Sequence, residues 1–360
     1  MQQNTFLLYG ANGYSGKLIA RFAHEYGLTP ILCGRNAQTI APLAKELQMD
    51  YLVVSLDDSA ALQSALSSVQ LVVHAAGPYD TTAAPMIAAC MATNTHYIDL
   101  NGDLEVFEMI QAYDAQAKEK GIMLLPGAGF DVVPTDCLSL WLKQQLPDAH
   151  LLQIAFTIIG SGLSRGTSIT TLQKLGMPGA RRQDGKIIAE PVGIRGMQVS
   201  FPPANHSFFV MSIPWGDNST AYFTTGIPNI ETYTGIGKGV WIFLKFQKLF
   251  NWLLRKQWVH KLITRNINSK APGPNDEVRN KAISLIRARV TNPAGKSIAA
   301  TMQCPEAYQL TALTVLQIAQ KILAGQYKAG YQTPASAYGP DLIMEIPGVQ
   351  RQLVDGDKWN

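Results

Sequence analysis

The sequence predicts an α/β protein: an N-terminal Rossmann-type, doubly wound parallel sheet, followed by a second α+β domain built on a mixed or antiparallel sheet. Three observations lead to this prediction. An apolar run at residues 5–9 leads straight into the glycine-rich turn GANGYSG and then into a helical pattern. Strand-like and helical patterns alternate as far as residue 125, as they do in parallel sheets. From about residue 151 the strand-like runs become longer, which favours an antiparallel or mixed sheet.

The first turn carries three glycines in the spacing GxxGxxG. Gly10 allows a tight turn after the strand, Gly13 allows the backbone to approach a pyrophosphate, and Gly16 allows the helix to pack closely on the strand. The start of the helix then offers N–H groups and the positive end of its dipole to phosphates. A strand–turn–helix unit that merely needs glycine is the alternative. The turn predicts these cofactor-binding residues: Gly10, Ala11, Asn12, Gly13, Tyr14, Ser15 and Gly16.

The second predicted strand, residues 30–33, is followed by Gly34, Arg35 and Asn36. At this position an NAD-binding fold carries an acidic residue that binds the ribose 2′-hydroxyl. Here an arginine takes its place, and a guanidinium can pair with a 2′-phosphate through two hydrogen bonds. An exposed loop arginine without a ligand is the alternative. These three residues favour NADP as the cofactor.

The next predicted strands and the turns after them complete the expected cofactor site. The strands are expected at 51–54, 70–74, 96–100 and 122–125, with helices at 60–66, 85–92 and 104–120. The strand at 70–74 runs into small residues that let a nicotinamide ribose approach the backbone. The predicted contacts there are Ala76, Gly77, Pro78 and Tyr79.

Residues 126–136 form a second glycine-rich stretch, PGAGFDVVPTD, which precedes an apolar helix. It stands where the nucleotide-binding domain is expected to end. Asp131 fits three roles, as a proton donor, a substrate anchor or a cap for the following helix. The predicted domains are residues 1–135, completed by 305–360, for NADP, and residues 136–304 for substrate binding and dimerisation.

Longer strand-like runs characterise the second domain, at 151–159, 194–201, 206–214, 219–226 and 285–292. The segment at 160–171 is rich in Gly, Ser and Thr, and it is expected to line a pocket mouth. Beyond it, residues 238–263 form a basic helical stretch that is too charged to span a bilayer. Such a helix can lie on a membrane surface, guard an acyl pocket, or pack on its own sheet or on a second subunit. Residues 240–263 are therefore a candidate for peripheral membrane contact.

Several of these motifs together resemble the saccharopine dehydrogenase-like oxidoreductases, most closely the branch that contains trans-acting enoyl reductases. They are the glycine turn, Gly34-Arg35, Gly77-Pro78-Tyr79, HYIDLNGD at 96–103 and PGAGFDVVPTD at 126–136. Gly166-Thr167, Gly273-Pro274, AYQLTA at 307–312 and QTPA at 332–335 extend the resemblance over nearly the whole chain. Two positions depart from it: Asp103 replaces a glutamate, and Cys304-Pro305-Glu306 replaces a Gly-Asp-Pro sequence. The resemblance implies NADP(H) use and a homodimer, but it implies no particular substrate because this branch is diverse.

Composition sets limits on function. The chain has 360 residues, a net charge of +4 and four widely separated cysteines. So mild a net charge does not argue for nucleic acid as a partner, and without a CxxC pair neither disulfides nor a metal site are expected. Because the sequence runs straight into its first strand, we expect no signal peptide and a cytoplasmic protein.

The leading functional hypothesis is an NADP(H)-dependent oxidoreductase that moves a hydride to or from a small or lipophilic substrate, such as an enoyl or acyl compound. The alternatives are a saccharopine-type dehydrogenase acting on a C–N bond and a non-catalytic, membrane-associated NADP-binding protein. No Tyr-xxx-Lys pair is present, so the proton donor must be another group. The candidates are Asp131, Tyr79 and Tyr97. The predicted substrate contacts are Phe130, Asp131, Gly166 and Thr167.

Overall fold

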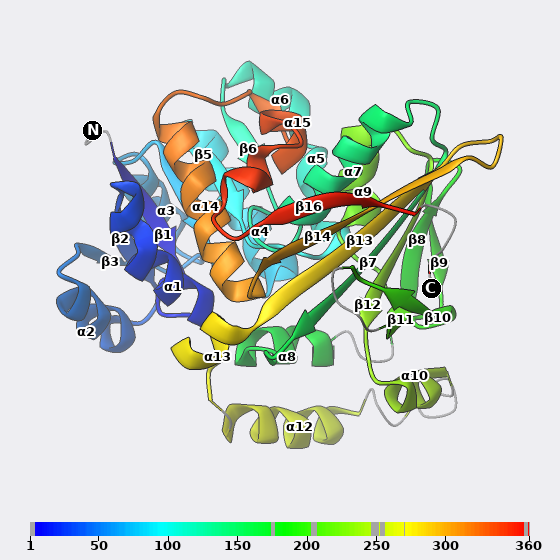
Figure 1. Cartoon of the computed structure of the whole chain (residues 1–360). Coiled ribbons are helices and arrows are strands. Elements are labelled where there is room, and N and C mark those ends of the chain that lie inside the picture. The colour runs from blue at the N-terminus through cyan, green and yellow to red at the C-terminus, as the bar shows by residue number, and fades with distance from the viewer. Residues whose placement is uncertain are drawn as a thin grey trace. The chain divides into compact units, whose positions relative to one another are not determined.

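The computed structural model describes residues 4–173, 177–202, 207–245, 252, 256–269, 271–355 and 359. The chain divides into two compact units: unit 1 comprises Met1–Val133 and Tyr308–Gly339, and unit 2 comprises Pro134–Ala307 and Pro340–Asn360. Figure 1 shows the elements of both units along the chain.

Unit 1 is built on a seven-stranded sheet in the order β15-β6-β5-β4-β1-β2-β3, and every strand pair in it is parallel. Its strands are β1 (Thr5–Tyr9), β2 (Thr29–Gly34), β3 (Tyr51–Val53), β4 (Leu71–His74), β5 (His96–Asp99), β6 (Met123–Leu125) and β15 (Gly330–Tyr331). Its helices are α1 (Tyr14–Phe22), η1 (Ala23–Tyr26), α2 (Ala37–Leu47), α3 (Ser59–Leu66), α4 (Tyr79–Thr93), α5 (Leu104–Gln111), α6 (Asp114–Glu119), α14 (Ala307–Leu323) and α15 (Pro334–Tyr338). The predicted Rossmann-type sheet is confirmed.

The core of unit 1 follows the two-residue period of its strands. Alternate strand residues such as Leu7, Val72 and Leu124 are fully buried in one cluster with side chains of α3, α4 and α5. The residues between them, such as Leu8 and Val73, are also fully buried and face the other side of the sheet. Because both faces are covered, these strands read as continuous apolar runs in the sequence.

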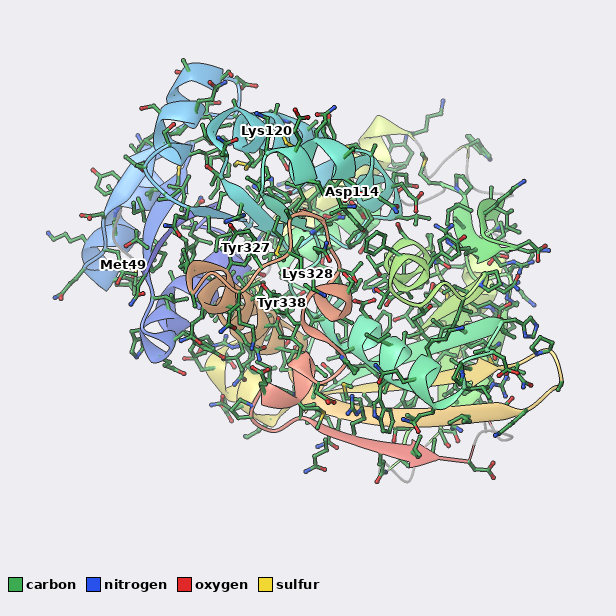
Figure 2. The ribbon with its side chains drawn as sticks, turned by 90° about the horizontal axis from the view of Figure 1, so that it is seen from above. Met49, Asp114, Lys120, Tyr327, Lys328 and Tyr338 are labelled. Carbon is green, nitrogen blue, oxygen red and sulfur yellow. The ribbon has the colours of Figure 1, made fainter. Side chains whose placement is uncertain are left out.

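The segment after α14 joins unit 1 through backbone pairing at the far edge of the sheet. The N–H of Gly330 donates to the carbonyl of Ile122 over 2.8 Å, and the N–H of Tyr331 donates to Asp114 over 2.9 Å. Lys328 donates to the carbonyl of Ser336 over 2.6 Å. Figure 2 shows Tyr327, Lys328 and Tyr338 gathered around this segment. These contacts return a distant part of the chain to the nucleotide-binding sheet.

Unit 2 is built on a mixed, nine-stranded sheet in which seven strands follow the order β10-β11-β12-β7-β13-β14-β16. Its strands are β7 (Leu151–Ile159), β8 (Gly179–Gln183), β9 (Lys186–Glu190), β10 (Gly196–Ser200), β11 (Ser207–Ser212), β12 (Asn229–Gly235), β13 (Ile283–Thr291), β14 (Ser297–Pro305) and β16 (Gln350–Val354). Its helices are α7 (Val133–Gln145), α8 (Arg165–Gln173), α9 (Asp217–Thr225), α10 (Lys238–Lys245), α12 (Gln257–Ser269), α13 (Asp276–Lys281) and η2 (Leu342–Glu345). β12 runs parallel to β7, whereas β13 pairs with β7 and β14 in antiparallel fashion. The predicted α+β fold on a mixed sheet is confirmed.

The structure differs from the sequence-based prediction at residues 219–226. This run is rich in Thr and aromatic residues and was expected to be a strand, but it belongs to the helix α9. Gly226 ends that helix in the left-handed conformation, with φ of 68°. Helix-ending signals and the tertiary environment therefore outweigh the strand preference of these side chains.

The predicted helix at 238–263 overlaps α10 and the start of α12. The residues between 246 and 255, except Trp252, lie outside the described residues, and so do the expected apolar positions Phe246, Leu249 and Leu253. The C-terminal tail is shared between the two units. Residues 340–360 belong to unit 2 because β16 pairs with β14, whereas 305–360 was expected to complete the first domain as a whole.

Candidate functional site

The predicted cofactor residues of unit 1 meet where the strand order of its sheet reverses. β1 lies between β4 and β2 in the sheet. The strands that follow β1 in the chain, β2 and β3, extend the sheet on one side of β1, whereas β4, β5 and β6 extend it on the other side. The N–H of Ala75, just after β4, donates to the carbonyl of Tyr9 at the end of β1 over 2.7 Å. The N–H of Gly10 donates to the carbonyl of Cys33 in β2 over 2.8 Å. Ligands of doubly wound sheets bind at such a switch point, beyond the carboxyl ends of the strands.

The glycine turn between β1 and α1 has no room for a side chain at Gly10 or at Gly16. Gly10 has φ of 85°, and a Cβ at this position would come within 2.8 Å of the Cβ of Ala76. A Cβ at Gly16 would clash with the carbonyl oxygen of Gly10. Gly13 precedes α1, and its own N–H donates to Gly10 over 3.0 Å. Residues 10–16, including Ala11, Asn12, Tyr14 and Ser15, therefore form the closely packed turn that the motif predicted.

Helices that begin at this edge differ in how their first turns are capped. Asn36 caps α2 by accepting from the N–H of Gln38 over 2.8 Å, and Asp58 caps α3 in the same way. The N-cap residues of α1 and α4 are Gly13 and Pro78, and neither of them forms a side-chain cap. The first turn of α1 therefore follows a residue with no side chain, and the N–H groups and positive dipole end of such a turn fit a dinucleotide phosphate.

Arg35 follows β2 at the same edge, between Gly34 and Asn36, and its side chain is exposed. In the described part of the chain no carboxylate pairs with its guanidinium. Burial raises the pKa of Tyr9 to about 12, and the positive charge of Arg35 opposes that rise, so the guanidinium lies near the end of β1. Asn12 of the glycine turn donates to the hydroxyl of Thr39 in α2 over 3.2 Å. The turn and the start of α2 thus form one continuous edge beside Arg35.

The turn from Ala76 to Tyr79 is held by a buried histidine that sequence reasoning missed. His74 is fully buried, and burial lowers its pKa to about 3, so the ring is neutral. Its Nε2 lies 3.1 Å from the hydroxyl of Thr82, which donates to the carbonyl of Ala76 over 2.8 Å. The same hydroxyl lies 3.0 Å from the carbonyl oxygen of Pro78, so Thr82 links the histidine to this turn. The Tyr79 hydroxyl donates to the carbonyl of His74 over 3.2 Å.

Asp99, at the end of β5, accepts hydrogen bonds from two loops, one that contains Asn101 and one that contains Gly127. Its Oδ1 accepts from the N–H groups of Asn101 and Gly127 over 2.9 and 2.8 Å. Its Oδ2 accepts from the hydroxyl of Tyr97 over 2.6 Å. The carboxyl is fully buried, and burial raises its pKa to about 6 against these hydrogen bonds. Tyr97 is also fully buried, and besides Asp99 its ring contacts that of His74, with 6.1 Å between the ring centroids.

Asp131 is half-buried and lies over the loop that Asp99 holds. Its Oδ2 is 2.7 Å from the point where a Cβ on Gly102 would stand, so a side chain at position 102 would displace the carboxyl from this place. Burial raises the pKa of Tyr79 well above its ordinary value, and the charges of Asp99 and Asp131 add to that rise. Asp131, Asp99 and Tyr79 therefore share one corner of unit 1.

α14 supports the loop that carries Phe130 and Asp131. The sequence did not predict that residues of this helix contribute to the site. The N–H of Phe130 donates to the hydroxyl of Thr311 over 3.0 Å, and a Cβ on Gly129 would come within 2.8 Å of the same side chain. Thr314 donates to the carbonyl of Ala128 over 2.8 Å. Phe130 itself is buried. These partners lie about 180 residues apart in the sequence, so no local pattern could indicate them.

The remaining predicted substrate residues, Gly166 and Thr167, stand in the first turn of α8 in unit 2. Ser164 accepts from the N–H of Thr167 over 3.2 Å and so acts as a cap for this helix. Unit 2 also holds a fully buried carboxyl, Asp217, whose pKa burial raises to about 7. Asp136 adds to that rise and accepts from the hydroxyl of Thr224 over 2.6 Å.

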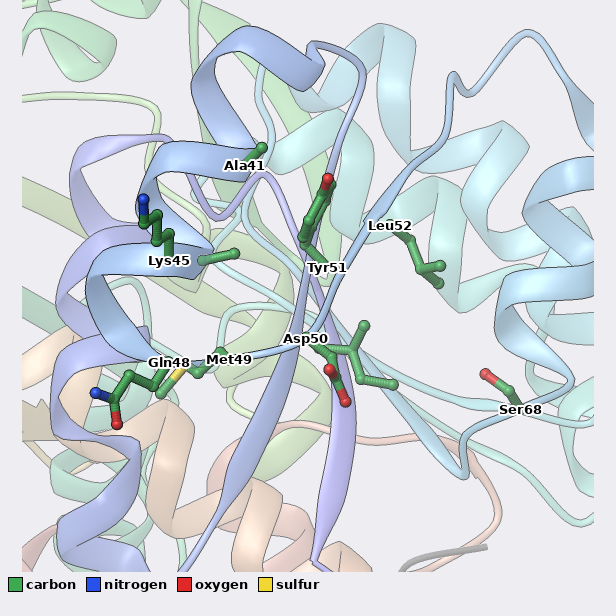
Figure 3. Close-up of a pocket in the computed structure, with 10 residues that line it drawn as sticks. Ala41, Lys45, Gln48, Met49, Asp50, Tyr51, Leu52 and Ser68 are labelled. Carbon is green, nitrogen blue, oxygen red and sulfur yellow. The ribbon is translucent and has the colours of Figure 1, made fainter.

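A separate depression of about 670 Å³ opens at the edge of unit 1, beside β3 and α2. Lys45, Gln48 and Met49 of the α2 end, with Tyr51 and Leu52 of β3, are among its lining residues (Figure 3). None of the predicted site residues lines it. Among the described residues, no group of three or more His, Cys, Asp or Glu side chains is placed to hold a metal ion. No helix in the described ranges is long and apolar enough to cross a membrane.

Comparison with known sequences confirms the predicted resemblance. Residues 6–125 match the saccharopine dehydrogenase NADP binding domain, and this match supports a nicotinamide cofactor. A relative from Mycobacterium tuberculosis, provisionally named as a trans-acting enoyl reductase, is 31% identical over 198 residues, covering 49% of this chain and 46% of the relative. A trans-acting enoyl reductase from Mycobacterium bovis is 33% identical over 138 residues, covering 36% of this chain and 33% of that protein. The chain thus spans about half the length, or less, of the curated relatives it matches.

Two solved structures share the fold over nearly the full chain. Saccharopine dehydrogenase (L-Glu forming) from Saccharomyces cerevisiae matches with a TM-score of 0.68 and 15% identity, covering 98% of this chain and 100% of that one. The homospermidine synthase of Legionella pneumophila, solved with NAD, matches with a TM-score of 0.64 and 10% identity, covering 98% and 92%. At these identities the matches establish the fold of the chain.

Proposed function

We propose that the protein is an NADP(H)-dependent oxidoreductase that transfers a hydride to or from a lipophilic, unsaturated acyl compound. The observation that carries this proposal is the combination at the switch point of the unit 1 sheet. A tight glycine turn there leads into a helix whose N-cap residue has no side chain, and after the next strand stands an exposed arginine that pairs with no carboxylate among the described residues. This arrangement matches the pyrophosphate and the 2′-phosphate of one dinucleotide.

Each part of the turn has its own role in this proposal. The N–H groups at the start of α1 bind the pyrophosphate, and Gly13 leaves the space for it. Arg35 binds the 2′-phosphate with its guanidinium, while Asn36 keeps its side chain engaged as the cap of α2. The backbone of Ala76, Gly77 and Pro78 lies beside the nicotinamide ribose, where small residues allow a close approach.

The bound nicotinamide supplies the hydride chemistry, and the protein must orient the substrate and supply one proton. We assign the proton to the carboxyl of Asp131, which is only half-buried and stands over Gly102. Tyr79 is the second candidate, although its hydroxyl is already used as a donor to His74. Tyr97 is fully buried, so its role in the proposal is to position Asp99. Phe130, Gly166 and Thr167 are assigned to substrate contact.

Relatives favour an enoyl substrate over an amino acid. The curated proteins with 31% and 33% identity carry enoyl reductase names, whereas the saccharopine dehydrogenase structure at 15% identity supports the fold alone. A C–N bond of the saccharopine type is therefore the second candidate. Oxidation of NADPH, followed by its absorbance, distinguishes the two when the protein is offered an enoyl thioester or a 2-oxo acid with an amine. Binding of NADPH without turnover of either would favour a non-catalytic protein.

The cofactor assignment is tested by titrating NADPH and NADH into the protein and into Arg35→Ala. We expect NADPH to bind more tightly, and the variant to lose affinity for NADPH alone by roughly tenfold or more, because a charge-assisted contact contributes about 1.5–3 kcal/mol. Arg21→Ala is the matched control, since Arg21 is exposed and pairs with Glu46 on the surface. Equal affinities for the two cofactors, or an unchanged preference in Arg35→Ala, would contradict the assignment.

We also propose a homodimer. The resemblance to the saccharopine dehydrogenase-like enzymes is the ground for this proposal. Sedimentation equilibrium of the full chain measures it directly.

A further inference from the structure

Large apolar side chains are exposed in one segment of unit 2. Val240 and Ile242 of α10 are 50% and 46% exposed, and Trp252 and Trp258 are 66% and 60% exposed. A tryptophan so far out of the core is uncommon because burying its ring is strongly favourable. Four such side chains lie within 19 residues of the sequence, and water solvates each of them poorly. We refer to α10, Trp252, Lys256 and α12 as the basic apolar segment.

The exposure of α10 does not come from loose attachment to its own sheet. Trp241 of this helix donates from its indole N–H to the carbonyl of Gly193 over 2.7 Å. Its ring lies against Phe209 of β11, with 4.8 Å between ring centroids. The helix is therefore docked through Trp241, and Val240 and Ile242 on either side of it remain in solvent.

Charge in this part of the sequence has one sign. Residues 232–275 contain no Asp or Glu, and they contain eight basic residues. These are Lys238, Lys245, Lys248, Arg255, Lys256, Lys261, Arg265 and Lys270. The whole chain has 30 basic and 26 acidic residues, so the rest of it has 22 basic and 26 acidic ones and a net charge of −4. The positive charge of the protein is therefore concentrated in this stretch.

The basic side chains of the segment are available to an external anion. Lys238, Lys245, Lys256 and Arg265 are exposed, and none of them pairs with a carboxylate in the described ranges. Lys245 lies over the ring of Trp241, 4.2 Å from its centroid, which places a cation beside the exposed apolar side chains. In Figure 1, α10 and α12 both lie at the lower edge of unit 2.

From this arrangement we propose that the basic apolar segment docks on the surface of a membrane that contains anionic lipids. Short helices with Trp and aliphatic side chains next to Lys and Arg bind in the plane of the interface, where the rings enter the headgroup region and the cations meet lipid phosphates. The absence of acidic residues complements a negative surface over the whole stretch. The inference is independent of the cofactor, since unit 1 carries the nucleotide residues and this segment belongs to unit 2.

Co-sedimentation of the full chain with lipid vesicles tests the proposal. We expect little binding to phosphatidylcholine vesicles, strong binding when phosphatidylglycerol is added, and loss of that binding at high salt. Trp252→Ser with Trp258→Ser, and separately Lys256→Glu with Arg265→Glu, should each lower the partition coefficient roughly tenfold or more. Leu353→Ser and Lys296→Glu are the matched controls, because these residues are exposed elsewhere in unit 2, and they should bind as the parent protein does.

Several results would overturn the proposal. One is equal binding to vesicles with and without phosphatidylglycerol. Another is binding that both double variants retain. If the variants instead dissociate an oligomer in the absence of lipid, as measured by light scattering, the segment is an interface with a second copy of the chain. Circular dichroism and thermal unfolding, measured in parallel, verify that each variant is folded.

Discussion

Asp99 is the residue on which the loops beside the candidate site depend. Its carboxyl receives the N–H groups of Asn101 and Gly127, and its own carbonyl receives the N–H of Ala128 over 2.8 Å. One buried side chain thus fixes the loop that contains Gly102 and the loop that contains Asp131. A carboxyl in this position is costly to ionise, because burial outweighs the hydrogen bonds that favour the charge.

This cost makes stability depend on pH in a direction that can be measured. The pKa of Asp99 is about 6 in the folded protein, above the ordinary value of 3.8, so folding favours the protonated acid. The contribution of the protonated Asp99 carboxyl to the free energy of unfolding is complete below about pH 4, and it is lost as the pH rises through about 6. Asp99→Asn keeps an acceptor for both N–H groups and does not titrate. Between about pH 4 and pH 7, the free energy of unfolding of the parent protein should therefore fall relative to the variant, by at most about 2–3 kcal/mol.

Urea unfolding of both proteins across this pH range measures the difference. Asp80→Asn is the control, because Asp80 is exposed in the first turn of α4. If the parent protein and Asp99→Asn follow parallel stability profiles, Asp99 is not a buried acid of raised pKa.

At the scale of single residues, the sequence predicted what local geometry determines. Gly10, Gly13 and Gly16 follow from the needs of one turn, and Arg35 follows from its place after the second strand. His74 and Thr311 could not be predicted, because their roles arise from burial and from contacts across the fold. One signal was available, and it was chemical: His74 and Asp99 are polar residues at the ends of buried strands.

At the scale of elements, the strand–turn–helix unit from β1 to α1 is the part most completely determined by its own sequence. Its strand, its turn and its helix were all expected where they occur. By contrast, α9 was expected to be a strand, because Thr, Tyr and Phe favour pleated structure wherever they are half-buried. The outcome there depends on packing in unit 2, where Asn218 donates to Thr232 of β12 over 3.1 Å.

The glycine turn leads to a prediction about its central residue. Gly13 has φ of −69°, which other residues adopt, and the neighbour nearest to a Cβ there is the carbonyl oxygen of Gly10 at 3.2 Å. Gly13→Val should therefore fold, while its side chain occupies the place of the pyrophosphate. We expect a small change in melting temperature and a loss of NADPH affinity of roughly tenfold or more, in line with a lost charge-assisted contact.

Thermal unfolding and NADPH titration of the same samples separate the two effects. Gly162→Val is the matched control, because a Cβ there meets nothing within 4 Å and the residue lies in unit 2. A folded Gly13→Val protein with unchanged affinity would show that Gly13 is not at the phosphates.

At the scale of the whole molecule, the alternation of strands and helices predicted the parallel sheet, and the change in strand length predicted the mixed sheet. The sheets with which the C-terminal strands β15 and β16 pair could not be predicted in the same way. Residues 330–331 pair with β6 in unit 1, whereas β16, only about 20 residues later, pairs with β14 in unit 2. Such pairings depend on which sheet edge is free once both sheets have formed, and no local pattern encodes that choice.

A crystal structure of the full chain with NADP⁺ tests the central claim most directly. The account predicts the pyrophosphate at the first turn of α1, the Arg35 guanidinium within hydrogen-bond distance of the 2′-phosphate, and the Asp131 carboxyl within one bridging water of the space that faces the nicotinamide ring. A nucleotide bound away from the glycine turn, for instance in the depression beside β3, would contradict the proposed function. A nucleotide in the turn with Asp131 farther than one water from that space would remove Asp131 as the proton donor.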